Sequence, residues 1–174
     1  LPLKTQLVEK IKILLNDHII EEIKEKPRTL SEIVLQLCLQ KNLKITTAES
    51  CTGGLIASQL TKVSGASASF EAGFVTYSNA IKSKLLNVNK NTIEKYGAVS
   101  EETVKEMAEG ALASANADLV IAVTGIAGPN GGSKDKPVGS VWIAWGSREK
   151  IYCHYFCIKA NRGYFQHAVA ARSL

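Results

Sequence analysis

Ser50 has the residue type and the setting that covalent catalysis requires. It lies in the segment 49–54, between an expected strand and an expected helix, as the serine of a nucleophile elbow does, although the pattern G-x-S-x-G is absent. Backbone N–H groups at such a helix start could hold an oxyanion or a phosphate. The alternative is that Ser50 or Thr52 only caps the helix. The local sequence by itself favours this alternative, because Ser and Thr are common N-caps.

A serine hydroxyl needs a base before it can attack a carbonyl group. The three histidines, His18, His154 and His167, lie outside the segments expected at the site. Tyr77 and Lys82 are therefore the candidates, because a lysine in a crowded apolar site can be neutral near pH 7 and accept a proton. The alternative for Lys82 is an ordinary solvated surface lysine, and the local sequence favours it.

The elements that must position these residues alternate along the chain. Strands are expected at 44–48, 72–77, 119–123, 141–145 and 151–158. A capping box at Thr29 to Glu32 opens one helix, which ends near Asn42, and further helices follow Gly54, Ser100 and Arg162. The last two strands form a hairpin that turns near 146–147. This order predicts a three-layer α/β/α sandwich with a mixed, mostly parallel sheet of about five strands.

Three unusual segments leave expected strands at the same edge of this sheet. They are 49–54, 77–82 and 124–132, and ligands of open α/β sheets bind beyond the carboxyl ends of the strands. The apolar run 119–123 predicts a central strand buried on both faces. The loop 124–132 that follows it holds four glycines. It is either an anion-binding nest or a long connection.

The composition indicates an ordinary globular chain. Its 174 residues are 45% hydrophobic and carry a net charge of +5, which suits one domain, perhaps with a small appendage, and favours anionic partners. No basic stripe is interleaved with aromatic residues, so a nucleic-acid partner is not expected. No apolar run approaches the roughly 18 residues of a membrane span, and no signal peptide is evident. We expect a cytoplasmic protein without a membrane partner.

The cysteines predict neither a redox motif nor a metal site. Cys38, Cys51, Cys153 and Cys157 include no C-x-x-C pair. Cys153 and Cys157 are expected on a strand, where their sulfurs would be about 13 Å apart, too far to share one ion. We expect four reduced thiols packed in the core.

Several short strings resemble the signature of the CinA C-terminal, or PncC, family. They are Thr47-Ala48-Glu49-Ser50-Cys51-Thr52-Gly53-Gly54, Phe74-Val75-Thr76-Tyr77-Ser78-Asn79, Tyr96-Gly97-Ala98-Val99-Ser100, Gly125-Ile126-Ala127-Gly128-Pro129, Lys136-Pro137-Val138-Gly139 and Val141-Trp142. The resemblance runs in order, without large gaps, from about Leu43 to Arg162.

This resemblance implies an amidohydrolase that converts nicotinamide mononucleotide to nicotinate mononucleotide and ammonia. It implies that Ser50 is the nucleophile and that Tyr77 and Lys82 handle protons, which reverses the local preference at Ser50 and at Lys82. It implies neither a metal nor a cofactor, and members of the family commonly pair, so a homodimer is expected. The expected substrate contacts are Glu49, Cys51, Thr52, Gly53, Gly54, Asn79, Gly125, Ile126, Ala127, Gly128 and Arg162.

The resemblance also predicts how the chain is organised. Residues 28–174 correspond to the family domain, and residues 1–27 resemble the helical tail of a preceding domain or a linker. The chain starts with Leu1, so we expect a fragment of a two-domain protein whose amino-terminal part resembles molybdopterin-binding domains. In such proteins that part is associated with a pyrophosphatase acting on ADP-ribose.

One departure from the family pattern leaves an alternative open. The family tends to show an aromatic-x-Gly-Asp-Arg segment with a second Arg four residues on, whereas this chain keeps Arg162 and has Gln166 at the second position. Loss of one phosphate-side charge favours a catalytically weak nucleotide-binding or regulatory domain. The intact Ser50, Tyr77 and Lys82 favour the hydrolase. A third possibility, a DNA-associated competence factor, conflicts with the missing basic stripe.

Overall fold

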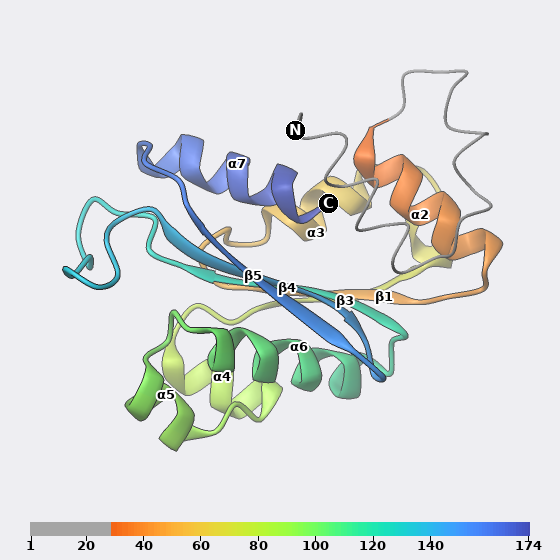
Figure 1. The fold of residues 1–174 in the computed structure, drawn as a ribbon. Coiled ribbons are helices and arrows are strands. Elements are labelled where there is room, and N and C mark those ends of the chain that lie inside the picture. Colours follow the sequence, from red (N-terminus) through yellow and green to blue (C-terminus); the bar gives the residue numbers. More distant parts are fainter. Residues whose placement is uncertain (1–28) are drawn as a thin grey trace.

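A five-stranded mixed sheet between two helical layers forms the framework of the computed structural model, which describes residues 29–174 (Figure 1). The strand order is β2-β1-β3-β4-β5. The strands are β1 (Ile45–Glu49), β2 (Phe70–Val75), β3 (Leu119–Gly125), β4 (Ser140–Ser147) and β5 (Ile151–Cys157). The three-layer α/β/α architecture is therefore confirmed. The expected helical tail at 1–27 lies outside the described residues.

The strand directions bring the chemically interesting loops to one edge. β1 is parallel to β2 and β3, whereas β4 is antiparallel to both β3 and β5. The carboxyl ends of β1, β2, β3 and β5 consequently lie at the same edge, as the amino end of β4 does. β3 is buried along its length up to Thr124, which confirms the central strand expected from its apolar run.

The helices cover the two faces of the sheet in separate layers (Figure 1). One layer holds α2 (Leu30–Gln40), α3 (Leu55–Thr61) and α7 (Arg162–Ser173), with Ile56 and Phe165 in its core. The other layer holds α4 (Asn79–Leu86), α5 (Lys90–Tyr96) and α6 (Glu101–Ala115), with Leu86 and Met107 in its core. Among residues 29–174, no helix is long and apolar enough to cross a membrane.

The expected helix starts are present. Thr29 accepts a hydrogen bond from the Glu32 N–H (3.3 Å), and the Glu32 carboxylate accepts one from the Thr29 N–H (2.6 Å), which completes the capping box. The Ser100 hydroxyl caps α6 by accepting from the Thr103 N–H. These local signals stand in the sequence itself, so they could be recognised without the fold.

Two helices were not expected, α4 and α5. A helix shows in a sequence through an apolar stripe, but on α4 the buried residues are Lys82 and Leu86, so a lysine stands in the stripe. α5 has no buried residue at all. β2 also begins and ends earlier than the expected 72–77, and the hairpin turns at 148–150 because β4 continues to Ser147.

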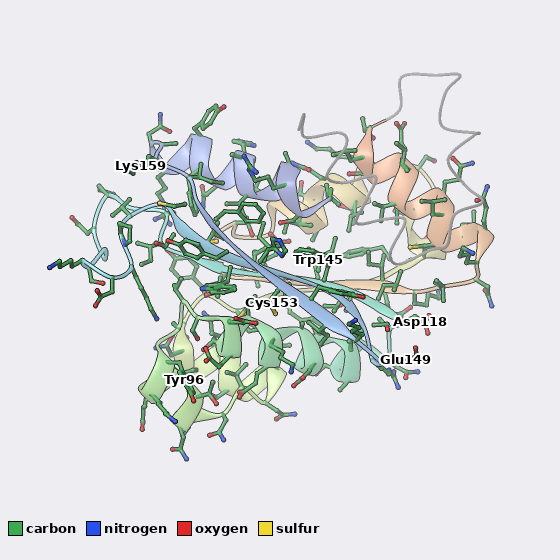
Figure 2. All side chains as sticks on the ribbon, in the orientation of Figure 1. Tyr96, Asp118, Trp145, Glu149, Cys153 and Lys159 are labelled. Atoms are coloured by element: carbon green, nitrogen blue, oxygen red, sulfur yellow. The ribbon has the colours of Figure 1, made fainter. Side chains whose placement is uncertain are left out.

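All four cysteines are free thiols, and Cys153 and Cys157 lie on β5 as expected. Cys38 and Cys51 are buried. Cys153 packs between the sheet and the layer that contains α6 (Figure 2). Cys157 is exposed, so the expectation that all four thiols are in the core was wrong for this residue. It occupies the last position of a strand at the sheet edge, where its side chain faces solvent.

Candidate active site

Ser50 follows β1 directly at the edge where the carboxyl ends of the parallel strands meet. This is the edge near Lys159, opposite the edge that carries Asp118 and Glu149 (Figure 2). The Ser50 N–H donates to the Val123 carbonyl of β3 at 3.1 Å. The carbonyl of the preceding residue, Glu49, accepts from the Thr76 N–H at 2.8 Å. The backbone at Ser50 is therefore held by both neighbouring strands, and its side chain is 7% exposed.

Lys82 lies beside Ser50 and is not a surface lysine. Its side chain is 1% exposed, and its Nζ lies 3.0 Å from Ser50 Oγ. Nζ also donates to the main-chain oxygens of Thr76 (2.9 Å) and Tyr77 (3.4 Å). The hydroxyl of Ser78 caps α4 by accepting from the Ile81 N–H. Lys82 lies on the first turn of this helix, which begins shortly after β2 ends.

Burial suppresses the charge of Lys82. Desolvation lowers the pKa of its amine from 10.5 to about 8, and the neighbouring Cys51 opposes this in part. Within residues 29–174, no carboxylate forms an ion pair with Lys82. A neutral amine has two N–H donors and one lone pair. The carbonyls of Thr76 and Tyr77 can take the two donors, which leaves the lone pair for the hydroxyl proton of Ser50.

Cys51 is adjacent to Ser50 but lacks the properties of a nucleophile. It is 4% exposed, and burial raises the pKa of its thiol from 9.0 to about 12. A backbone hydrogen bond to the thiol lowers that pKa in part, the nearby Glu49 raises it further, and Lys82 and Arg162 lower it by smaller amounts. The reactive form of cysteine is the thiolate, which is scarce here at neutral pH.

The turn after Ser50 is organised around the carboxylate of Glu49. Gly53 and Gly54 adopt positive φ angles of 63° and 99°, which glycine tolerates best. Glu49 folds back into this turn and accepts a hydrogen bond from the Gly54 N–H at 3.0 Å. Glu49 and Gly54 were both expected to contact substrate, yet these polar groups already bind each other. Thr52 is buried and donates its hydroxyl to Glu49.

Arg162 joins two of the other expected segments at the same edge. Its Nη2 donates to the phenolic oxygen of Tyr77 at 2.8 Å, and its Nη1 donates to the carbonyl of Gly128 at 3.0 Å. Tyr77 is 62% exposed. Its contact with Lys82 is made by its main-chain oxygen, and the hydrogen bonds of the described residues include none between the two side chains.

The first half of the glycine-rich loop, residues 125–128, is packed, whereas residues 129–132 are exposed. The Ile126 N–H donates to the Ser140 carbonyl, and the Ile126 carbonyl accepts from the Gly139 N–H, each at 2.8 Å. A Cβ on Gly125 would lie 2.8 Å from the Ser140 oxygen, and Ala127 and Gly128 are buried. Close packing explains why Gly125, Ala127 and Gly128 are small. Asn79, the first residue of α4, is exposed.

Two residues outside the expected site, Gln166 and Thr76, contact it. Gln166 on α7 donates its Nε2 to the Cys51 carbonyl at 2.9 Å, so it ties that helix to the turn after Ser50. Thr76 supplies the carbonyl nearest to Lys82. No local signal marks either residue, because a glutamine on a helix and a backbone oxygen are compatible with any setting.

The segment 96–100 also reaches this edge. The hydroxyl of Thr124, at the end of β3, donates to the Ala98 carbonyl at 2.7 Å. Lys136 donates its Nζ to the Tyr96 carbonyl. The strings that carry the family resemblance are therefore neighbours in space at the carboxyl edge of the sheet.

The family model described as the CinA C-terminal domain matches residues 27–174. The chain belongs to the CinA C-terminal domain family. A CinA-like protein from Colwellia psychrerythraea is 53% identical over 174 residues, which is all of this chain but 40% of that relative. The nicotinamide-nucleotide amidohydrolase PncC from Enterobacter agglomerans is 57% identical over 105 residues, or 60% of this chain and 64% of that protein.

Solved structures of CinA proteins share the fold. The competence/damage inducible protein CihA from Agrobacterium tumefaciens superposes with a TM-score of 0.80 at 41% identity, covering 83% of this chain and 88% of that one. The CinA superfamily protein from Escherichia coli also gives a TM-score of 0.80, at 37% identity, covering 83% and 84%. The match at this level of identity agrees with the three-layer architecture described above.

Proposed function

We propose that this chain is an amidohydrolase that converts nicotinamide mononucleotide to nicotinate mononucleotide and ammonia. The observation that carries the proposal is the 3.0 Å contact between Ser50 Oγ and the Nζ of a buried Lys82 whose pKa is lowered to about 8. A serine beside a partly neutral amine is a nucleophile with its general base. The name of the relative from Enterobacter agglomerans, a nicotinamide-nucleotide amidohydrolase, supports the choice of substrate.

In the first half of the proposed reaction, Lys82 accepts the hydroxyl proton of Ser50 as Oγ attacks the carboxamide carbon. The carbonyl electrons move to oxygen, and the N–H groups of Cys51 and Thr52 are the candidates to stabilise that oxyanion. The protonated Lys82 then gives its proton to the amide nitrogen. The carbon–nitrogen bond breaks, ammonia leaves, and the nicotinoyl group remains on Ser50 as an ester.

In the second half, water replaces ammonia. Lys82 takes a proton from the water as its oxygen attacks the ester carbon, and the tetrahedral species collapses. The bond to Ser50 Oγ breaks, and Lys82 returns the proton to Oγ. The products are nicotinate mononucleotide and an enzyme in its starting protonation state, so one amine serves as base and acid in both halves.

The nucleotide portion is proposed to bind across the edge from Ser50. Arg162 presents a planar guanidinium that can form charge-assisted hydrogen bonds with a phosphate. Its hydrogen bonds to the phenol of Tyr77 and the carbonyl of Gly128 hold it between two loops. Asn79, on the first turn of α4, is exposed and is a further candidate contact for the nucleotide.

The experiment that tests the proposal is ammonia release from nicotinamide mononucleotide, with free nicotinamide as the comparison. We expect the protein to release ammonia from nicotinamide mononucleotide much faster than from free nicotinamide. Equal, negligible release from both compounds by folded protein would contradict the proposal.

A second candidate function, nucleotide binding without turnover, is favoured by Gln166. Its amide is engaged with the Cys51 carbonyl, so the position that carries a second Arg in the family pattern supplies no charge to a phosphate. Calorimetric binding of nicotinamide mononucleotide without ammonia release would favour this candidate. The hydrolase is the better supported function, because binding alone gives no reason to bury Lys82 against Ser50.

A further inference from the structure

Glu49 is a carboxylate that is fully buried, with 0% of its side chain exposed. Within residues 29–174, no Lys or Arg forms an ion pair with it. Its oxygens instead accept from the Thr52 hydroxyl (2.6 Å) and from the N–H groups of Gly54 (3.0 Å), Ile56 (3.1 Å) and Ala57 (2.8 Å). A buried charge persists in a protein only where such bonds compensate for lost hydration.

The bonds of Glu49 satisfy a specific need of α3. The first N–H groups of a helix have no partner within the helix, and a side chain at the N-cap usually supplies one. The N-cap of α3 is Gly54, which has no side chain to do so. Glu49 takes over this role from the strand that precedes the turn, so one carboxylate joins the end of β1 to the start of α3.

Ser50 lies inside the loop that this carboxylate closes. We infer that Glu49 is a positioning residue, which fixes the turn 50–54 and thereby holds Ser50 Oγ at the Nζ of Lys82, and that it is not a substrate contact. The inference rests on the proposed role of Ser50 as nucleophile. It also places the substrate phosphate away from the start of α3, because a negative charge already occupies those N–H groups.

The variant Glu49→Gln tests this role with little change of volume. An amide turns an N–H₂ group toward backbone N–H donors, so at least one of the bonds in the turn is lost. Thr52→Val is the second variant, because it removes the hydroxyl bound to Glu49 without altering the carboxylate. Either change should displace Ser50 by a fraction of an ångström, which is enough to slow an oriented reaction by about tenfold to a hundredfold.

Glu106→Gln is the matched control. Glu106 on α6 also uses its carboxylate to hold the start of a helix, since it accepts from the Asn89 N–H (2.7 Å) and the Thr92 hydroxyl (2.6 Å) next to α5. Its partners are not in the turn that carries Ser50. We expect this variant to lower the melting temperature and to leave the turnover of the folded protein unchanged.

Two measurements distinguish a positioning role of Glu49 from a substrate-binding role. The second of them does not depend on the identity of the substrate. For nicotinamide mononucleotide, Glu49→Gln should lower kcat by about tenfold or more and change KM little, because the lost precision affects the chemical step. Labelling of Ser50 by a fluorophosphonate, a general probe of nucleophilic serines, should slow by a similar factor in Glu49→Gln but not in Glu106→Gln. This second readout applies even if the unmutated protein does not hydrolyse the mononucleotide.

A raised KM with unchanged kcat would show that Glu49 contacts substrate and would overturn the inference. Labelling of Ser50 in Glu49→Gln at the rate of the unmutated protein would overturn it as well. If circular dichroism shows Glu49→Gln to be unfolded, Thr52→Val decides by the same two measurements.

Discussion

At the residue scale, the structure separates Ser50 from its neighbour Cys51 by their surroundings. Both are buried at the same turn, but Ser50 Oγ has the Lys82 amine at 3.0 Å, whereas burial raises the pKa of the Cys51 thiol to about 12. Sulfur is intrinsically the better nucleophile, so the sequence alone leaves the two in competition. We therefore propose the Ser50 hydroxyl, and not the Cys51 thiol, as the nucleophile.

Activity should depend on pH through Lys82. Its pKa is lowered from 10.5 to about 8 by burial, and the amine is the base only when deprotonated. We therefore expect kcat/KM to rise with pH and to level off above an apparent pKa near 8.

Lys82→Arg should lose about a thousandfold or more of the activity, because a guanidinium cannot accept the proton. A pH–rate profile of the unmutated protein, together with the residual rate of this variant, checks both statements, and an active Lys82→Arg protein would exclude the base role.

Arg162 should determine the preference for a phosphorylated substrate. The energy of binding a remote phosphate helps to place the carboxamide at Ser50, so kcat/KM should be far higher for nicotinamide mononucleotide than for its riboside or free nicotinamide. Arg162→Ala should narrow this preference by roughly tenfold to a hundredfold, since charge-assisted bonds contribute about 1.5–3 kcal/mol. The measurement is kcat/KM for all three compounds with both proteins. Equal values for mononucleotide and riboside in the unmutated protein would mean that no phosphate site operates.

At the element scale, the position of Lys82 depends on how α4 packs against α6. Gly110 on α6 lies against the end of α4, and a Cβ there would come within 1.9 Å of the Leu86 carbonyl oxygen. Two helices can approach this closely only where a side chain is absent. The contact fixes the distance of α4 from the sheet and thereby the reach of Lys82 toward Ser50.

Gly110→Ala should therefore damage both stability and catalysis. The clash is with backbone, so α4 must move, and we expect a destabilisation of about 1–3 kcal/mol, the usual cost of overpacking, with a lower kcat in the protein that still folds. Gly163→Ala on α7 is the matched control, because its Cβ would meet only the Asn161 side chain, at 3.8 Å. It should stabilise the protein slightly through better helix propensity. Urea unfolding measures the effect on stability, and ammonia release measures the effect on kcat. Equal stability and equal kcat of the two variants would contradict the proposed packing role of Gly110.

The elements with strong local signals were predictable, and those determined by tertiary packing were not. The capping box at Thr29 and the apolar run of β3 stand in the sequence, so their elements follow from it. α4 was not predicted because one of its two buried residues is Lys82, which an apolar pattern assigns to the surface. For the same reason the local sequence favoured a solvated surface lysine over a catalytic base at Lys82. Only the family resemblance drew attention to a catalytic role for it. The bond from Gln166 to the Cys51 carbonyl joins α7 to a turn distant in the sequence, so no local pattern contained it.

At the scale of the whole molecule, the domain tolerates a buried lysine for which an apolar residue would be more favourable. Charged groups are costly to bury, and the lowered pKa of Lys82 expresses that cost. Active sites commonly retain groups that weaken the fold. The free energy of unfolding of the domain should therefore reveal the cost of burying Lys82, without any measurement of activity.

Lys82→Met should raise the free energy of unfolding at pH 7, because no charge is then buried. The unfolded chain holds the lysine proton up to about pH 10.5, whereas the folded protein releases it near pH 8. In this window the unfolded state binds more protons, so the stability of the unmutated protein rises with pH. The advantage of the methionine variant should shrink accordingly between pH 8 and pH 10.5. Urea unfolding at both ends of this pH window measures the difference in free energy of unfolding between Lys82→Met and the unmutated protein. Lys84→Met, at an exposed position of α4, is the control. A difference that stays constant between the two pH values would contradict the burial of a charge at Lys82.

The most direct test of the account is kcat/KM for ammonia release from nicotinamide mononucleotide by Ser50→Ala and Cys51→Ala, measured side by side on folded protein. We expect Ser50→Ala to lose activity on the order of 10⁴-fold or more, as removal of a serine nucleophile does elsewhere. Cys51→Ala should retain most of the activity, because its buried thiol stays protonated. An inactive Cys51→Ala protein beside an active Ser50→Ala protein would contradict the assignment of Ser50 as the nucleophile.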